Sequence, residues 1–226
     1  MDSDPTIAQS IGARATQEDR AVMAGLGSGC TVAILADGMG GHARGDVAAQ
    51  VACEAALATL QRAYSLPTAD PWDAVAIVGR AVRSAADAVR GVDCDPRTKP
   101  PGCTLIVAVR WPDAVVLAHV GDSIAWVCAE RMTTQHGWHH LLRSCLPTCE
   151  HVEMHVREIP QHHEVVIASN GVESHGWGTA EDIVRAQLGR SDPGQDNATA
   201  VVLTATPLPA DTVVWAQDID SAKERP

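Results

Sequence analysis

The fold is decided by a stretch in which an apolar segment meets a glycine-rich turn, Ile34-Leu35-Ala36-Asp37-Gly38-Met39-Gly40-Gly41-His42. The apolar residues from Thr31 to Ala36 have the length of a buried strand, so Asp37 is expected where that strand leaves its sheet. The glycines permit tight turns and leave main-chain carbonyls uncovered. The Asp37 carboxylate and the Gly38 carbonyl could therefore bind a hard cation, although a strand that ends in Asp-Gly is also typical of a plain turn.

Composition limits the class of protein. The chain has 226 residues, of which 46% are hydrophobic, so it can bury one core and we expect one domain. The formal net charge of -11 argues against nucleic acid or an anionic membrane as a partner, because both repel an acidic surface. Aromatic residues make up only 3% and Phe is absent, so the core must be packed from Val, Ala, Leu and Ile.

The cysteines indicate the compartment. The chain has 7 cysteines, an odd number without a Cys-x-x-Cys pair, and its N-terminus lacks an apolar segment. This pattern favours thiols in a reducing compartment, and we assign the chain to the cytoplasm. No apolar stretch approaches the roughly 20 residues that a membrane span needs.

Three helices are expected. Gly45–Arg62 and Pro71–Arg90 have amphipathic patterns, the second with Asp70 as N-cap and Pro71 at its first position. Thr179–Leu188 begins with the spacing of a capping box. The buried face of the first helix is predicted to carry Val47, Val51, Ala55, Leu57 and Leu60. That of the second is predicted to carry Val75, Val78, Val82, Ala86 and Val89.

Apolar runs predict the strands, and polar residues stand at their ends. The runs are Thr6–Ala8, Thr31–Ala36, Thr104–Trp111, Val115–Val120, Ile124–Cys128, Glu164–Ser169 and Ala198–Thr206. Since strands and helices come in groups rather than in alternation, we expect antiparallel sheets. Acidic residues or amides recur at strand ends beside glycine or a small polar residue, at Asp37, Asp122, Asn170 and Asp196.

Six short motifs carry a resemblance to a known family. In order they are Gln17-Glu18-Asp19-Arg20, Asp37-Gly38-Met39-Gly40-Gly41-His42, Gly102-Cys103-Thr104, Gly121-Asp122-Ser123, Ser169-Asn170-Gly171 and Gln195-Asp196-Asn197-Ala198-Thr199. This order resembles that of the metal-dependent type 2C protein serine/threonine phosphatases, and Met39 with the short linkers resembles their bacterial branch. Each motif alone is weak, whereas six in the family's order, from about Gly12 to Thr204, are specific.

The resemblance implies an α+β fold, a four-layer α-β-β-α sandwich of two antiparallel β-sheets flanked by antiparallel helix pairs. It also implies a metal site at one end of the sandwich. We expect residues 1–206 to form a single catalytic domain and residues 207–226 to form a C-terminal tail. We expect the chain to be a monomer.

The resemblance further implies which residues bind metal. Asp37 resembles the carboxylate that bridges two ions. Glu18 and the Gly38 carbonyl resemble ligands of one ion, while Asn170 and Asp196 stand at the positions that hold the other. The ions implied are Mn²⁺ or Mg²⁺, hard cations that prefer oxygen ligands.

The implied chemistry is phosphate hydrolysis. Asp122 matches a ligand of a third, weaker ion, and Arg14 falls where the family has an arginine that binds the substrate phosphate, a role that suits its planar fork. Two ions roughly 3.5–4 Å apart would share a water, lower its pKa and direct it at phosphorus, so no side-chain nucleophile is needed. The implied substrate is phosphoserine or phosphothreonine in a protein, and the implied partner is a bacterial Ser/Thr kinase.

Asn170 departs from the family pattern, which has an aspartate there. An amide oxygen can coordinate a cation but brings no negative charge, so ions at Asp196 and Asp122 should bind more weakly. Three explanations stay open: an inactivating substitution made to trap a complex, a natural relative with weak or lost activity, or a site that works with fewer ions. Partial deamidation of the Asn170-Gly171 dipeptide is a further hypothesis.

Two classes of function are therefore compatible with the sequence. One is a phosphatase, and the other is a pseudophosphatase that binds a phosphoprotein or another partner without turnover. We favour the enzyme because Glu18, Asp37, Asp122 and Asp196 all remain, whereas loss of activity would be expected to erode several of them.

Two further features are less defined. Met39 stands where eukaryotic relatives have a histidine proposed as general acid, so leaving-group protonation would fall to water or to His42. Residues 132–137 resemble the family's flap, but the insert that normally follows is shortened to Trp138–Pro147. Both zinc ligation and an ordinary loop are compatible with the residues gathered within 136–155, namely His139, His140, Cys145, Cys149, His151 and His155.

Overall fold

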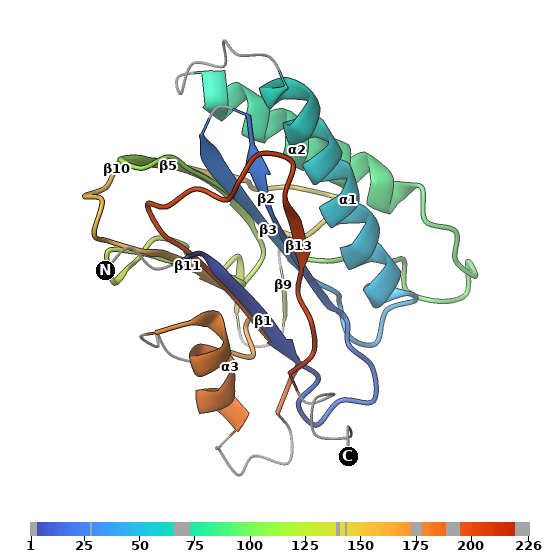
Figure 1. Ribbon diagram of the computed structural model, residues 1–226. Coiled ribbons are helices and arrows are strands. Elements are labelled where there is room, and N and C mark those ends of the chain that lie inside the picture. The colour runs from blue at the N-terminus through green and yellow to red at the C-terminus, as the bar shows by residue number, and fades with distance from the viewer. Residues whose placement is uncertain are drawn as a thin grey trace.

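The computed structural model describes residues 4–27, 29–65, 73–138, 141–142, 144–172, 178–188 and 195–219. Two antiparallel β-sheets pack face to face, with two helices against the outer face of one sheet and a third helix against the other (Figure 1). The predicted α-β-β-α sandwich is confirmed, but within the described residues the smaller main sheet carries one helix where the prediction had a pair. None of the described helices is long and apolar enough to cross a membrane.

The larger sheet has the strand order β10-β5-β4-β3-β2-β13. Its strands are β2 (Asp19–Leu26), β3 (Cys30–Asp37), β4 (Leu105–Arg110), β5 (Ala114–Val120), β10 (Glu153–Glu158) and β13 (Val213–Trp215). The central strand β3 is buried on both faces, with Val32 and Ile34 in the core under the helices and Ala33 and Leu35 in the core between the sheets. Burial on both faces explains why this stretch is continuously apolar.

The smaller of the two main sheets has the order β1-β12-β11-β6-β7. Its strands are β1 (Thr6–Ser10), β6 (Ile124–Val127), β7 (Glu130–Arg131), β11 (Val165–Ala168) and β12 (Ala198–Leu203). β1 lies at one edge of this sheet. A separate short pair is formed by β8 (Gly137–Trp138) and β9 (Leu141–Leu142).

The helices are α1 (Gly45–Tyr64), α2 (Ala74–Arg90) and α3 (Ala180–Leu188). The predicted buried face of α1 is wrong in part: Leu57 and Leu60 are buried, but the other three residues are only partly buried. The face that is buried consists largely of small residues, Ala48, Ala49, Ala52, Cys53 and Ala56. Because α1 packs against both the sheet and α2, small side chains allow the close approach that both contacts require.

The other two helices follow the prediction more closely. In α2, four of the five predicted residues are buried and only Val75 is exposed, at 38%. The proposed N-cap Asp70 and Pro71 lie outside the described residues. At the start of α3, the capping box is confirmed, because Thr179 N–H donates to Asp182 Oδ2 at 2.9 Å and Asp182 N–H donates to Thr179 Oγ1 at 3.2 Å.

Part of the segment 207–226 adds to the larger sheet. β13 pairs with Val22–Ala24 of β2, and a short bridge joins Gln9 to Asp218. Whether this segment docks could not be predicted from its sequence. In the structure it covers the outer edge of β2.

Candidate metal and phosphate site

Carboxylates from both sheets meet at one end of the sandwich. Asp37 ends β3 and lies opposite Asp19, the first residue of β2. Asp122 follows β5, and Asp196 precedes β12 of the other sheet. The negative charges of Asp19, Asp122 and Asp196 all act on Asp37. Together with Glu18, these four residues form what we call the carboxylate cluster.

Burial and the repulsion between neighbouring carboxylates both disfavour the charged forms of the residues in this cluster. Burial is the main reason that the pKa of Asp37 lies well above its ordinary value, and the neighbouring carboxylates raise it further. Asp19 is fully buried, and burial raises its pKa to about 6 although its Oδ2 accepts a hydrogen bond from Thr199 Oγ1 at 2.8 Å. Carboxylates held this close together require protons or cations to neutralise them.

The glycine-rich turn forms a cradle for Glu18. A Cβ on Gly45 would lie 3.0 Å from Glu18 Oε1, and one on Gly40 would lie 3.6 Å from Oε2. A Cβ on Gly38 would overlap with the carbonyl oxygen of Gly45, so only glycine fits there. Burial, followed by the charge of Asp46, raises the pKa of Glu18. The absence of side chains thus lets the backbone close around a carboxylate.

Arg14 lies at the rim of the cluster. Its Nη2 donates to Asp196 Oδ2 at 2.7 Å, and both side chains are accessible, with 48% and 40% of their surface exposed. The guanidinium is therefore held beside the cluster while remaining open to an anion from solvent.

Asn170 contacts the carboxylate that follows β5. Its Nδ2 donates to Asp122 Oδ2 at 3.2 Å, which leaves Asn170 Oδ1 as a possible cation ligand. Burial raises the pKa of Asp122, and the hydrogen bond from Asn170 partly opposes this rise.

The donor set fits hard divalent cations. All of the candidate ligands are oxygens: carboxylates of Glu18, Asp37, Asp122 and Asp196, the Asn170 amide and the Gly38 carbonyl. Among the described residues, Asp19 Oδ1 and Asp122 Oδ1 are buried without a hydrogen-bond partner. Buried acceptors without partners are costly, and a cation or its bound water would satisfy them.

His42 is positioned by the loop before β4. Its Nδ1 donates to the Pro100 carbonyl at 2.7 Å, and its N–H donates to the Met39 carbonyl at 3.2 Å. Within the described part of the chain, no hydrogen bond or ion pair joins His42 to the carboxylate cluster. The neutral ring that donates from Nδ1 has no proton on Nε2.

Sequence reasoning missed two residues of the site. Asp19 was given no role, yet it lies on the same face of β2 as Ala21 and Met23, which face the second sheet. The alternation of a strand was the signal that could have revealed it. Asn197 was also overlooked: its Oδ1 accepts from Glu18 N–H at 2.9 Å, and its Nδ2 donates to the Ile11 carbonyl at 2.9 Å. It therefore fixes the segment that carries Arg14 and Glu18.

Comparisons with known proteins identify the family of the chain. The profile of the family described as protein phosphatase 2C matches residues 9–187. Serine/threonine protein phosphatase PstP of Mycobacterium tuberculosis is 34% identical over 109 residues, which cover 48% of this chain and 20% of PstP. The chain thus spans about a fifth of the length of the curated relatives it matches.

Solved structures share the fold. The serine/threonine phosphatase of S. agalactiae superposes with a TM-score of 0.73 at 18% identity, over 89% of this chain and 99% of that one. Stp1 from Staphylococcus aureus gives 0.72 at 18% identity, over 90% and 97%. The catalytic domain of PstP, solved with 2 manganese ions, gives 0.68 at 22% identity, over 94% and 98%.

Proposed function

Because the chain belongs to the protein phosphatase 2C family, we propose that it hydrolyses phosphoserine and phosphothreonine in proteins, with two Mn²⁺ or Mg²⁺ ions as cofactors. The observation that carries this proposal is the meeting of Asp37 with carboxylates from both sheets. The relatives named as serine/threonine phosphatases, and the PstP structure with manganese, support it.

In this proposal, Asp37 would be shared by the two ions. Glu18 and the Gly38 carbonyl would hold one of them, and Asn170 and Asp196 would hold the other. Asp122 would hold a third, weaker ion. When bound, such ions supply Lewis acidity and a water of lowered pKa in line with phosphorus.

The protein's own residues bind and orient the substrate. Arg14 is anchored by Asp196 at 2.7 Å, so its planar fork is already aligned at the rim of the cluster. We assign to it the binding of two phosphate oxygens, an interaction in which charge-assisted hydrogen bonds also fix the phosphate's orientation.

Leaving-group protonation is assigned to water. The Nδ1 of His42 donates to the Pro100 carbonyl, and within the described residues no hydrogen bond or ion pair joins His42 to the carboxylate cluster. His42 would therefore position the loop before β4, and solvent would provide the proton.

Hydrolysis of p-nitrophenyl phosphate with Mn²⁺ tests the proposal. We expect activity in the natural chain and in Asn170→Asp, and none in Asp37→Asn, because only the last removes the bridging carboxylate. If Asn170→Asp is also inert at saturating Mn²⁺, the phosphatase proposal is wrong and binding without turnover accounts better for Asn170.

We also propose the setting in which the enzyme acts. Its substrates would be cytoplasmic phosphoproteins made by a bacterial Ser/Thr kinase, and the enzyme would act as a monomer. The named relatives are bacterial serine/threonine phosphatases, which supports this assignment. Faster release of phosphate from phosphothreonine than from phosphotyrosine peptides is the expected result, and the opposite preference would contradict it.

A further inference from the structure

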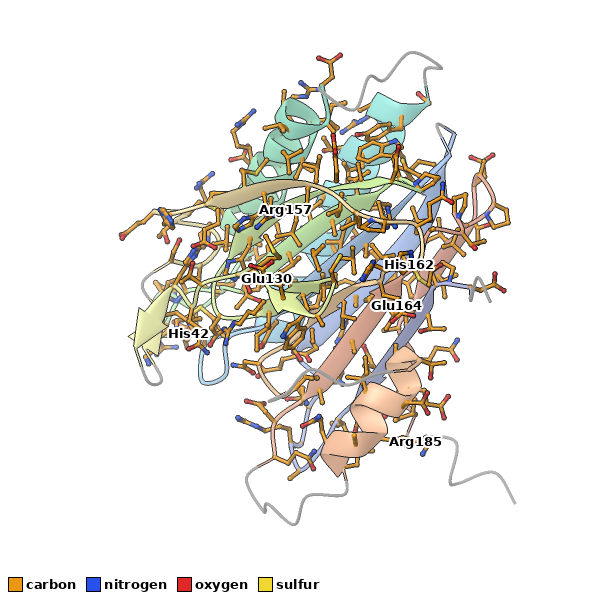
Figure 2. The ribbon with its side chains drawn as sticks, turned by 90° about the vertical axis from the view of Figure 1, so that its left-hand side faces the viewer. His42, Glu130, Arg157, His162, Glu164 and Arg185 are labelled. Atoms are coloured by element: carbon orange, nitrogen blue, oxygen red, sulfur yellow. The ribbon has the colours of Figure 1, made fainter. Side chains whose placement is uncertain are left out.

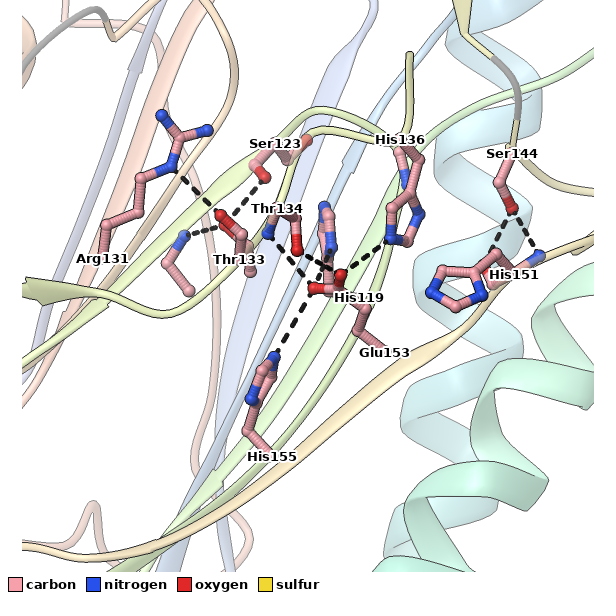
Figure 3. Close-up of polar contacts among 12 residues, drawn as sticks. His119, Ser123, Arg131, Thr133, Thr134, His136, Ser144, His151, Glu153 and His155 are labelled. Carbon is pink, nitrogen blue, oxygen red and sulfur yellow. Dashed lines mark hydrogen bonds and ion pairs between the residues drawn. The ribbon is translucent and has the colours of Figure 1, made fainter.

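A second group of ionisable side chains lies on the larger sheet, close to the turn that carries Asp122. His119 is on β5, and Glu153 and His155 are on β10, where Glu153 lies directly opposite His119. His136 belongs to the segment after β7. In Figure 3 the imidazoles of His119, His136 and His155 surround the Glu153 carboxylate, and the ligand atoms of His119, His136 and Glu153 all lie within 4.8 Å of one another. We call these four residues the imidazole cluster.

The distances from Glu153 to the imidazoles are longer than those of good hydrogen bonds. Glu153 Oε2 lies 3.6 Å from His119 Nδ1 and 3.5 Å from His155 Nε2, and Glu153 Oε1 lies 3.4 Å from His136 Nε2. Good N–H···O hydrogen bonds measure about 2.7–3.2 Å. Ligand atoms that surround one Zn²⁺ tetrahedrally at about 2.0–2.2 Å are separated by about 3.3–3.6 Å.

Burial leaves these nitrogens without partners. His119 is fully buried and His136 is 9% exposed. Among the residues that the structure describes, both ring nitrogens of His119, Nε2 of His136 and Nε2 of His155 lack a hydrogen bond. Buried polar atoms are normally satisfied, so several unsatisfied nitrogens that converge on one carboxylate indicate a missing ligand.

The surrounding residues hold the carboxylate in place. Thr134 donates to Glu153 from its N–H, at 3.1 Å, and from its hydroxyl. Outer hydrogen bonds of this kind orient metal ligands. Thr134 and His136 both belong to residues 132–137, so a bound ion would fasten this segment to β5 and β10.

From these observations we propose that His119, His136, Glu153 and His155 form a binding site for Zn²⁺, separate from the carboxylate cluster. Imidazole nitrogens with one carboxylate suit Zn²⁺, whereas Mn²⁺ and Mg²⁺ prefer the all-oxygen site. This set differs from the histidines and cysteines singled out from the sequence: only His155 is common to both. Of the others, His139 and His140 lie outside the described residues.

Zn²⁺ binding through His136 has a specific structural consequence. Without metal, Gly121 N–H donates to His136 Nδ1 at 3.2 Å, so the neutral ring carries its proton on Nε2. Ligation through Nε2 requires the other tautomer, in which Nδ1 bears the proton and can no longer accept from Gly121. The backbone amide of Gly121 is therefore a direct reporter of metal binding.

Calorimetric titration of the chelator-treated full chain with Zn²⁺ tests the site. The Asp37→Asn variant is titrated with saturating Mg²⁺ present, so that Zn²⁺ at the carboxylate cluster is suppressed. We expect one Zn²⁺ per chain. Glu153→Gln should weaken binding at least about tenfold, since even loss of an outer-shell partner costs about 10–100-fold in metal affinity.

A second pair of histidines supplies the matched control. The ring centroids of His162, which is exposed, and His163, which is half-buried, lie 4.3 Å apart on the loop after β10, and Figure 2 shows His162 on the opposite side of the molecule from His42. The double variant His162→Gln with His163→Gln should bind Zn²⁺ like its parent. If this variant loses the bound ion, or if Glu153→Gln retains it at full affinity, the proposal is overturned.

Spectroscopic measurements test ligation directly, so that the result does not depend only on variants of buried residues that could misfold. Co²⁺ in place of Zn²⁺ should give the visible absorption of a tetrahedral centre in the parent chain and lose it in His119→Gln. In ¹⁵N NMR spectra, the Gly121 amide signal should shift when Zn²⁺ is added. An unchanged Gly121 signal at saturating Zn²⁺ would contradict ligation by His136.

Discussion

The Gly121-Asp122 turn touches both clusters, because Asp122 belongs to the carboxylate cluster and Gly121 N–H donates to His136 of the imidazole cluster, yet burial changes the protonation of the two clusters in opposite ways. Burial raises the pKa values of Asp19 and Asp37, which favours the uncharged acids. Burial instead lowers the pKa of His119 to about 4, which favours the uncharged base. Both clusters thus avoid charge inside the protein, but one requires protons or cations to do so and the other leaves buried ring nitrogens without hydrogen-bond partners.

The chemistry of the donor atoms follows from this difference. Oxygen anions attract hard dications, whereas neutral imidazoles offer nitrogen to a softer ion. Glu153 is the exception in the second cluster: burial raises its pKa, but hydrogen bonds from Thr134 and the contact with His136 outweigh this, and the pKa falls to about 2. One anion among imidazoles is therefore retained.

The largest expected effect is that one substitution abolishes the function of the carboxylate cluster and leaves metal binding at the imidazole cluster intact. Asp37→Asn should lower Mn²⁺-dependent hydrolysis of p-nitrophenyl phosphate more than about 100-fold, because loss of an outer-shell partner alone costs about 10–100-fold. Zn²⁺ affinity at the imidazole cluster should stay within about twofold of the parent. Loss of both properties together would show that the clusters are not independent.

The metal-free chain should show two opposing pH dependences of stability. Folded Asp19 holds its proton more tightly than unfolded Asp19, so its contribution, roughly 3 kcal/mol at about 1.4 kcal/mol per pKa unit, is present below about pH 4 and is lost as pH rises through about 6. Folded His119 holds its proton less tightly, so a contribution of similar size is lost as pH falls from about 6.5 towards 4.

Urea unfolding of two variants would separate these contributions. Between pH 4 and 6.5, Asp19→Asn should leave a free energy of unfolding that rises with pH, and His119→Gln should leave one that falls. If the free energy of unfolding changed with pH in the same direction in both variants, the two contributions would not oppose each other.

The backbone of the glycine-rich turn should matter to one cluster only. Gly38→Ala should cost about 1–3 kcal/mol of stability, as overpacking does, and weaken Mn²⁺ binding at the same time. Gly41 has a φ of +73° but open space around its Cα, so Gly41→Ala should cost about 1–2 kcal/mol and spare Mn²⁺ affinity. Calorimetry and thermal melts check both variants, and equal Mn²⁺ affinities would contradict the cradle around Glu18.

A negative charge at position 170 should strengthen Mn²⁺ binding but lower the stability of the metal-free chain. Asn170→Asp should raise Mn²⁺ affinity about tenfold, since nearby charges interact by about 4 kcal/mol at an effective dielectric of 20 and repulsion from Asp122 cancels part of this. Without metal the same change replaces a hydrogen bond by two facing carboxylates, so the melting temperature should fall. A higher melting temperature without metal would contradict the contact with Asp122.

The smallest expected effect is at His42. A general acid typically contributes about 100-fold or more, so His42→Gln should lower the rate less than about tenfold if water protonates the leaving group. The rate with p-nitrophenyl phosphate and with a phosphothreonine peptide checks this, because the peptide has the poorer leaving group. A larger loss with the peptide alone would assign the acid role to His42.

The two clusters also differ in how well the sequence predicted them. Asp37 and Asp122 follow apolar runs and stand beside glycine, so their position at a strand end could be inferred from pattern alone. Asp19 could not be separated from its charged neighbours until its strand was defined. The imidazole cluster was missed because β10 was not predicted: with residues 138–155 taken as irregular, nothing paired Glu153 with His119.

Helix packing shows the same limit on sequence reasoning. The pattern of valines in α1 predicted a face that the structure leaves partly exposed, because the helix contacts two neighbours and its alanines fill the narrower gap. Period alone places apolar residues on a face but does not say how close the neighbouring element comes.

The short strand β13 has a consequence for the solution behaviour of the protein. With the bonds from Ala216 N–H to the Ala21 carbonyl and from Gly25 N–H to the Thr212 carbonyl, it occupies the free side of the strand that begins at Asp19. An exposed edge strand has unpaired N–H and C=O groups that can form hydrogen bonds with a strand of another molecule. Shortening the chain to residue 208 should therefore cause it to self-associate through β2, even with every candidate ligand intact.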